Sequence, residues 1–183
     1  MSEEGHRLAV IGTAGRDSSI EMSHKTWDWM VNDFKSRLTG NEHLISGGAA
    51  WADHLAVHAF VRGWVTSLTL HFPAPFTGFY YLGERGSAGS TANYYHQRFR
   101  DITGVNSLLE IGTALKMGAQ KTEESPRIGM RALFLRNSKV AEHLDRLLAY
   151  TFKHPTMGGT GDTWKKCHPS VEKTHVLIPL DFQ

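Results

Sequence analysis

Three short segments rich in small residues stand out as places where the backbone could hold a phosphate or a ribose. They are residues 12–17 (Gly-Thr-Ala-Gly-Arg-Asp), 46–50 (Ser-Gly-Gly-Ala-Ala) and 158–163 (Gly-Gly-Thr-Gly-Asp-Thr). Glycine lets backbone N–H groups approach a ligand oxygen closely, and the start of a following helix favours negative charge. A tight turn explains any one of these loops equally well, but three at one edge of a sheet favour a binding site.

Two well-known phosphate motifs are missing. None of the three loops continues into the Gly-Lys-Ser/Thr of a Walker A motif, and the sequence has no Gly-x-Gly-x-x-Gly fingerprint. These absences argue against ordinary NTPase and NAD-dehydrogenase chemistry.

Four polar side chains near these loops are candidates for ligand contacts. Arg16 and Arg136 have the planar guanidinium group that pairs bidentately with phosphate, although an exposed arginine is usually just solvated. Asn137 lies on an otherwise apolar helical stripe, so it either ties a neighbouring loop internally or reaches a ligand. Asp53 falls at the start of a predicted helix, where a carboxylate suits the macrodipole or braces the loop.

His54 and His58 are one helical turn apart, a spacing that can hold a metal ion. No glutamate lies between them as in His-Glu-x-x-His, and the sequence names no third ligand. We therefore interpret them as a solvated helix face and expect no metal site. Cys167 has no cysteine partner, and nothing in the sequence supplies it with a Cys/His nucleophilic arrangement.

The elements that must position these residues follow from hydrophobic periodicity. Short apolar runs predict strands near residues 7–11, 43–46, 66–72, 147–152 and 174–179. Helical stripes between them begin near Trp27, Ala52 and Met130, and a short helix is expected at residues 164–168. Strands alternating with helices indicate right-handed crossovers and a parallel sheet. We predict an α/β fold, a Rossmann-like open parallel sheet sandwiched by helices.

The regular alternation breaks between about residues 73 and 126, which we predict to be an aromatic-rich insertion. We expect helical stretches after Thr91 and near Val105, a mobile loop over residues 83–90 and a solvated linker over 121–125. Seven aromatic residues fall between Phe76 and Phe99, too many to leave in water. They predict a second small core or a subunit interface, and hence a homo-oligomer.

Length and composition set the remaining bounds. A chain of 183 residues with 40% hydrophobic residues favours a single domain spanning residues 1–183. The formal net charge of +2 is too small for a dedicated polyanion binder, so nucleic acid is an unlikely partner. No apolar run approaches the length of a membrane span and the N-terminus lacks a signal-peptide pattern. We expect a cytoplasmic protein without a membrane partner.

Four motifs in order then give a resemblance to a known family. They are Val-Ile-Gly-Thr-Ala-Gly-Arg at 10–16, Ile-Ser-Gly-Gly-Ala-Ala-Trp-Ala-Asp at 45–53, Leu-Arg-Asn at 135–137 and Gly-Gly-Thr-Gly at 158–161. The chain resembles the SLOG superfamily, which unites DprA, the LOG hydrolases and the YspA-like proteins, and its pattern is most similar to the YspA-like branch. The resemblance implies a Rossmann-like fold that binds nucleotides or nucleotide-derived ligands and commonly forms dimers or larger assemblies.

The chain departs from the family pattern at several positions. Trp51 stands where the YspA-like branch usually has glycine, and its ring is a candidate for stacking on a base. Asp162 occupies the threonine position of Gly-Gly-x-Gly-Thr, with Thr163 one place later. Met157 replaces the proline of the LOG motif and Lys165 replaces its catalytic glutamate, which argues against hydrolysis by the LOG mechanism.

The combined prediction is a protein that binds a nucleotide or nucleotide-derived signal at the carboxyl edge of the sheet, as a sensor or sequestering protein without a cofactor. One alternative is a nucleoside 5′-monophosphate N-glycosidase whose acid is Asp162, Asp53 or a residue of the insertion. Another is DprA-like binding of single-stranded DNA. The residues expected to contact the ligand are Gly12, Thr13, Arg16, Ser46, Gly47, Gly48, Asp53, Arg136, Asn137, Gly158, Gly159, Thr160, Gly161, Asp162 and Thr163.

Overall fold

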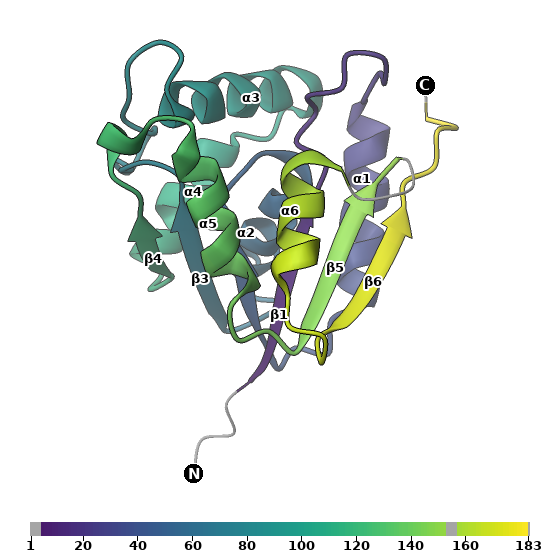
Figure 1. Cartoon of the computed structure of the whole chain (residues 1–183). Coiled ribbons are helices and arrows are strands. Elements are labelled where there is room, and N and C mark those ends of the chain that lie inside the picture. The colour runs from purple at the N-terminus through teal and green to yellow at the C-terminus, as the bar shows by residue number, and fades with distance from the viewer. Residues whose placement is uncertain (1–4, 153–156, 183) are drawn as a thin grey trace.

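The computed structural model describes residues 5–152 and 157–182, and its strands form one six-stranded parallel sheet of order β4-β3-β2-β1-β5-β6 (Figure 1). The strands are β1 (His6–Gly12), β2 (Glu42–Ser46), β3 (Ser67–Phe72), β4 (Gln120–Glu123), β5 (Arg146–Thr151) and β6 (Glu172–Leu177). The α-helices are α1 (His24–Ser36), α2 (His54–Val61), α3 (Ala88–Thr103), α4 (Ser107–Lys116), α5 (Arg131–Ala141) and α6 (Gly158–Lys166). Short 3-10 turns, η1 (Trp51–Asp53) and η2 (Pro126–Ile128), precede α2 and α5. The predicted Rossmann-like α/β architecture is confirmed.

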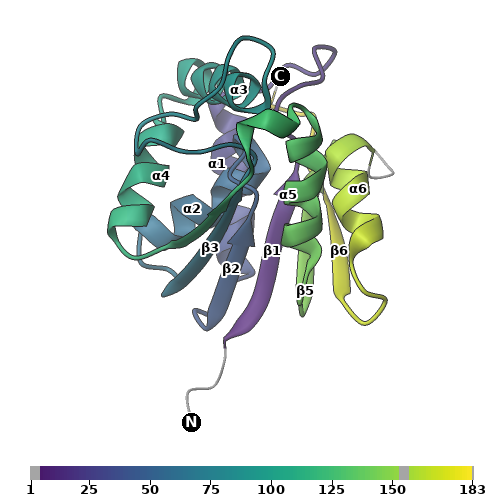
Figure 2. The same ribbon diagram turned by 60° about the vertical axis from the view of Figure 1, so that its left-hand side comes forward.

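The direction of the crossovers decides which helices cover which face of the sheet. The chain steps one way from β1 through β2 and β3 to β4, and then the opposite way from β4 to β5 and β6. Right-handed crossovers in opposite directions place their helices on opposite faces. Accordingly α1 to α4 cover one face, whereas α5 and α6 cover the other (Figure 2). The order reverses between β1 and β5, and such a switch point is where ligands bind in open α/β sheets.

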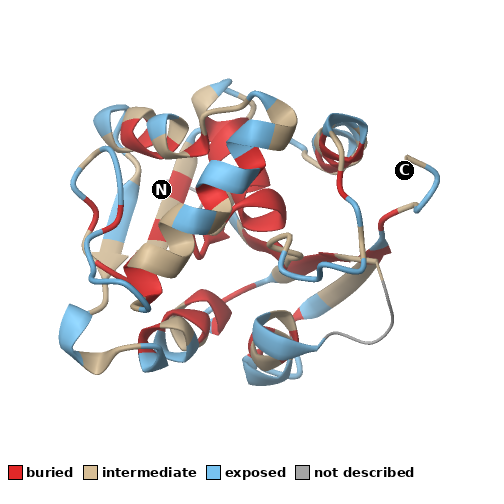
Figure 3. Ribbon diagram, turned by 90° about the horizontal axis from the view of Figure 1, so that it is seen from above, coloured by how far each residue is buried: buried red, intermediate tan, exposed pale blue. Residues whose placement is uncertain are grey.

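Successive side chains of the central strand β1 point alternately into the two hydrophobic cores, one on each face of the sheet. Leu8 and Val10 of β1 pack under α1 and α2, whereas Ala9 and Ile11 pack under α5. All four side chains are at most 4% exposed, as expected for a central strand covered on both faces. Seen from the carboxyl edge, the buried residues gather between the two helical layers (Figure 3).

Capping explains why α1 begins where it does. The side-chain oxygen of Ser23 accepts a hydrogen bond from the Thr26 backbone N–H, and Thr26 Oγ1 accepts one from the Ser23 N–H. This capping box satisfies two donors that the first helical turn would leave unpaired. None of the helices in the described ranges combines the length and apolar character needed to cross a membrane.

Within the aromatic-rich segment 73–126, residues 73–119 form the crossover from β3 to β4 and contain α3 and α4, and residues 120–123 form the sheet strand β4. The prediction of a linker at 121–125 is wrong, because Gln120–Glu123 pairs with β3 as an edge strand. This strand is polar and partly exposed, so it lacks the apolar run by which strands are recognised. The predicted loop at 83–90 is also too long: α3 begins at Ala88, and the side chain of Ser87 caps it.

The third glycine segment forms a helix, whereas the sequence predicts a loop there and a helix only from residue 164. Helix α6 begins at Gly158 and includes the whole of residues 158–163. Glycine is a poor helix former, but tertiary contacts outweigh that preference here. Thr160 Oγ1 donates to the carbonyl of Gly12, and Asn137 Nδ2 donates to the carbonyl of Gly159.

Candidate functional site

A cavity of about 380 Å³ opens at the carboxyl edge of the sheet, on the side covered by α5 and α6. Its walls come from the end of β1 and the loop after it, from the turn before α2, from α5, and from the first turns of α6. The position corresponds to the β1/β5 switch point, and the volume falls in the range of small-molecule sites. The lining residues are Ile11, Gly12, Thr13, Ala14, Arg16, Asp17, Ala49, Asp53, Leu133, Phe134, Arg136, Asn137, Val140, Met157, Gly158, Gly159, Thr160 and Thr163.

A buried polar group forms one wall of this cavity. Arg136 is 8% exposed and donates from Nε to Asn137 Oδ1 at 3.0 Å and from Nη1 to the carbonyl of Gly47. Its Nη1 also lies 4.0 Å from Oδ2 of Asp53, which is likewise 8% exposed. Asn137 in turn donates to the carbonyl of Gly159 and to Asp162 Oδ2 at 3.2 Å. The network therefore joins the loop after β2 to α5 and α6.

Burial sets the electrostatics of this wall. It raises the pKa of the Asp53 carboxyl above its usual range, while the Arg136 guanidinium opposes that shift. Burial also lowers the pKa of Arg136, and Asp53 acts against it. Burial disfavours the charged form of both groups, so the charge on each is stabilised by the opposite charge on the other.

The first turn of α6 faces the same cavity. The first N–H groups of a helix have no intrahelical acceptor, and Met157 at the N-cap offers no side-chain cap. Gly158, Gly159 and Thr160 line the cavity at this point. The positive end of the helix dipole is therefore directed at the space that a ligand would occupy.

The mouth of the cavity combines a cation with apolar side chains. Arg16 is exposed there and its guanidinium carbon lies 5.0 Å from the centre of the Tyr95 ring. Phe134 and Met157 are 55% and 78% exposed. A polar wall inside an apolar rim suits a ligand with an anionic or hydroxylated part and a flat, weakly polar part.

Ten of the residues predicted to contact the ligand line this cavity. They are Gly12, Thr13, Arg16, Asp53, Arg136, Asn137, Gly158, Gly159, Thr160 and Thr163. Of the two alternatives that the sequence left open for Asn137, the structure shows the internal tie, because its amide joins α5 to α6; contact with a ligand stays a prediction, and the side chain lines the cavity.

The other five predicted residues lie outside the lining: Ser46, Gly47, Gly48, Gly161 and Asp162. Gly161 is buried within α6. Asp162 Oδ2 accepts hydrogen bonds from Asn137 and, at 2.7 Å, from Lys166.

Residues 46–48 support the wall from behind. A Cβ on Gly47 would lie 2.6 Å from Arg136 Cδ and 2.8 Å from Asp53 Oδ2, so only glycine leaves room for the pair. Ser46 Oγ donates to the Asp53 carbonyl at 2.8 Å. The carbonyl of Gly48 accepts from the Tyr81 hydroxyl at 2.9 Å. This loop therefore positions Asp53 and Arg136 without lining the cavity.

Sequence reasoning missed the apolar part of the site. The helical stripe that includes Leu133 and Phe134 predicts core residues, but Phe134 is exposed at the cavity mouth. Nothing in a single sequence indicates that the aromatic residue just before Arg136 and Asn137 on this helix is exposed. Met157 stands out in the sequence only as the replacement of a proline.

Two interpretations of single residues are wrong. Trp51 is 1% exposed and its ring packs edge-on against Phe99, with 4.9 Å between ring centres, so it is not offered to a base. His54 and His58 are 0% and 6% exposed, so they do not form a solvated face. Helix α4 matches the helical stretch expected near Val105, but its packing against α2 was not predicted. This packing buries both imidazoles and brings Glu110 to them.

The fold and the cavity together define an α/β protein of the Rossmann-like class, with a candidate ligand site at the β1/β5 switch point. The chain is 33% identical over 171 residues to the uncharacterized protein R261 of Acanthamoeba polyphaga mimivirus, covering 87% of this chain and 90% of the viral protein. The chain belongs to the same family as this viral protein. No family model and no solved structure matches the chain.

Proposed function

We propose that the protein binds a nucleotide or a nucleotide-derived signalling ligand in the cavity at the carboxyl edge of the sheet. The observation that carries this proposal is the meeting of the α6 N-terminus with the Arg136–Asp53–Asn137 wall at the switch point. A phosphate is favoured by the uncapped helix end and by Arg16, while a base fits the exposed ring of Phe134. The ligand would then place its phosphate at the first turn of α6 and its base against Phe134.

A relationship to the SLOG superfamily forms part of this proposal. Its support is the order of the four motifs together with the backbone at Trp51, which has φ +64°. This left-handed conformation favours glycine, the residue that the YspA-like branch usually has at that position. The backbone conformation thus matches the branch pattern although the side chain does not.

The direct test is a binding panel on the full chain. Thermal shift and calorimetry would compare adenosine, guanosine, cytidine and uridine monophosphates, nucleoside diphosphates and inorganic phosphate. At least one nucleotide is expected to raise the melting temperature more than phosphate does. Arg16→Ala should weaken that nucleotide about tenfold or more, since hydrogen bonds to charged groups contribute about 1.5–3 kcal/mol.

The matched control is Arg127→Ala, which removes an exposed arginine from η2, outside the cavity lining. It should leave nucleotide affinity unchanged. Absence of binding by every nucleotide at millimolar concentration, or equal losses in the two variants, would contradict the proposal.

A second candidate function is hydrolysis of the N-glycosidic bond of a nucleoside 5′-monophosphate, favoured by the state of Asp53. Burial raises the pKa of this carboxyl, which is the direction a general acid needs. Release of free base would be followed chromatographically in the wild type and in Asp53→Asn. Turnover that disappears in the variant would make the protein an enzyme, whereas nucleotide binding without turnover would favour the sensor function.

Binding of single-stranded DNA, the other alternative function, would be tested in the same panel. An electrostatically driven complex would weaken steeply as salt is raised. The net charge of +2 leads us to expect no such complex at physiological salt.

We also propose that the chain self-associates through the surface between α3 and the hairpin joined by the Phe76–Tyr81 bridge. Phe79 and Tyr80 of the hairpin and Tyr94 of α3 are 68%, 51% and 55% exposed. Large aromatic side chains exposed in this way are typical of contact surfaces.

A further inference from the structure

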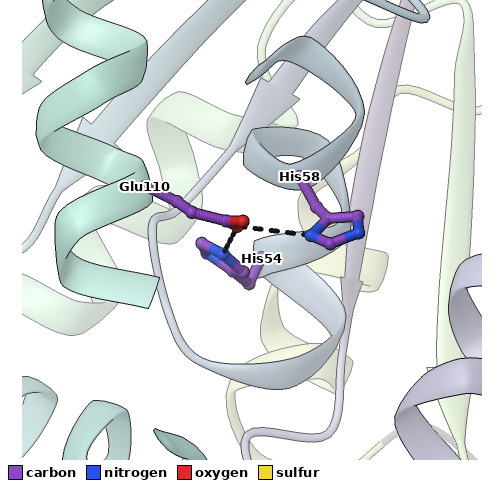
Figure 4. Close-up of side chains that lie close together, drawn as sticks. All are labelled: His54, His58 and Glu110. Carbon is purple, nitrogen blue, oxygen red and sulfur yellow. Dashed lines mark hydrogen bonds and ion pairs between the residues drawn. The ribbon is translucent and has the colours of Figure 1, made fainter. Parts of the chain in front are cut away.

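Three potential metal ligands converge between α2 and α4 (Figure 4). His54 and His58 project from successive turns of α2, and Glu110 projects toward them from α4. His54 Nε2 lies 2.6 Å from Glu110 Oε2, and His58 Nδ1 lies 3.3 Å from the same oxygen. The three ligand atoms all lie within 4.8 Å of one another.

The surroundings of the cluster are mostly aromatic. The ring of Trp27 lies 6.0 Å from that of His54 and 5.2 Å from that of His58, and Phe99 lies 5.7 Å from His54. The side chains of His54, His58 and Glu110 are 0%, 7% and 17% exposed. A dry shell of this kind strengthens electrostatic interactions inside it.

His54 is incompletely satisfied by the protein. Its Nδ1 is buried and has no hydrogen-bond partner among the described residues. A fully buried imidazole with one unpaired nitrogen is costly in a core, where polar groups are normally hydrogen-bonded. The nitrogen that faces the cluster is Nε2, which lies 2.6 Å from Glu110 Oε2, so Nε2 is the atom that would bind an ion.

We propose that His54, His58 and Glu110 bind a divalent transition-metal ion of the zinc type. Two imidazole nitrogens and one carboxylate oxygen are a ligand set that zinc accepts, and a water molecule can take the fourth position. This proposal is independent of the nucleotide cavity, because none of the three side chains lines that cavity.

The distances need only small adjustments to accommodate the ion. Zinc–ligand bonds of about 2.0–2.2 Å in a tetrahedron place neighbouring ligand atoms about 3.3–3.5 Å apart. The 3.3 Å between His58 Nδ1 and Glu110 Oε2 already matches that separation. The 2.6 Å hydrogen bond from His54 would open by somewhat less than 1 Å, and the two imidazoles would move together.

Arg62 competes with the metal ion for Glu110. Its Nη1 donates to Glu110 Oε1 at 2.9 Å, from a side chain that is 39% exposed. A guanidinium this close to a divalent cation opposes its binding, but an exposed side chain can swing into solvent. Arg62 is therefore expected to reduce the affinity of the site without blocking it.

Occupancy would fasten α4 to the start of α2. His54 directly follows Asp53, which belongs to the wall of the nucleotide cavity. A metal ion would hold this turn in place and raise the stability of the fold by the free energy of binding. The role of the ion would thus be structural, because it would link α2 to α4.

The test uses the untagged full chain, stripped with a chelator and dialysed. Titration with Co²⁺ and Zn²⁺ would be followed by visible absorption, calorimetry and thermal melting. The expected result is one ion per chain, a cobalt absorption band in the visible range and a rise in melting temperature. His58→Gln and Glu110→Gln should each weaken the metal at least about 100-fold, since loss of a mere supporting partner costs 10–100-fold.

Two further variants separate a metal site from a purely structural His–Glu–Arg cluster. Arg62→Gln keeps all three ligands and should bind the ion about three- to tenfold more tightly, because an ion pair of about 1 kcal/mol no longer competes. His24→Gln removes an exposed histidine at the start of α1 and should change nothing. The proposal is overturned if neither wild type nor Arg62→Gln gives a metal-dependent band or melting shift, or if His24→Gln weakens the metal as much as His58→Gln.

Discussion

The buried pair of Arg136 and Asp53 makes a sharp quantitative prediction about the cavity wall. Replacing Arg136 with methionine keeps most of the side-chain volume but leaves Asp53 without its cation in a buried position. It also removes the donors to the carbonyl of Gly47 and to Asn137 Oδ1. Breaking a buried pair by removing one partner costs about 3–5 kcal/mol.

For a chain of this size, 1 kcal/mol corresponds to about 2–4 °C in melting temperature, so Arg136→Met should lower it by roughly 6–20 °C. Asp53→Asn should cost less, because Arg136 then keeps the Gly47 carbonyl and Asn137 as acceptors. In the double variant no buried charge is left unpaired. Its loss should therefore be smaller than the sum of the single losses by about 1–3 kcal/mol.

The assay is chemical denaturation of the three variants and the wild type, without nucleotide or metal, at pH 7. Unfolding free energies would be compared in a double-mutant cycle. If the losses add to within about 0.5 kcal/mol, the two charges do not depend on each other, and the electrostatic coupling of Arg136 to Asp53 is refuted.

Three further predictions concern pH, backbone and surface. Burial lowers the pKa of His96 to about 3, so the unfolded chain takes up a proton first as the pH falls, and the free energy of unfolding should drop by about 2.3 kcal/mol between pH 6.5 and 4.5. His96→Gln should flatten this part of a stability–pH profile, and an unchanged slope would contradict the prediction. Gly12→Ala should abolish folding or cost more than about 3 kcal/mol by thermal melting, since Gly12 has φ +146° and its added Cβ would lie 2.0 Å from the Tyr150 carbonyl oxygen. Tyr80→Ser, at an exposed position, should give smaller particles in light scattering with little change in melting temperature. Tyr81→Ser, at a position 1% exposed, should lower the free energy of unfolding by about 3–5 kcal/mol. Equal losses of stability in the two variants would contradict this difference in burial.

The two histidines of α2 show how far a single sequence leads toward a site. Their spacing predicts that both imidazoles share one helical face. Their partner Glu110 lies 52 residues beyond His58, on a helix whose packing direction no local pattern encodes. Burial, and with it the chemistry of the cluster, depends on that packing.

The position of the cavity was predictable in part from the sequence. Strands of one parallel sheet bring their carboxyl ends to the same edge, so the glycine segments that follow β1 and β5 in the chain had to meet there. The segment after β2 follows the same rule, but only Ala49 of it lines the cavity, because residues 46–48 lie behind Arg136. The strand order, which local sequence does not specify, decided this difference.

The sequence by itself determined the α/β class, the parallel sheet and the edge of the sheet at which the cavity opens, because these follow from apolar periodicity and from the handedness of crossovers. Tertiary structure alone decided that residues 158–163 are helical, that Gln120–Glu123 is a strand and that Trp51 adopts a left-handed backbone in the core. In each case the local sequence favours the observed conformation only weakly or favours a different one, and contacts with residues distant in the chain outweigh that preference.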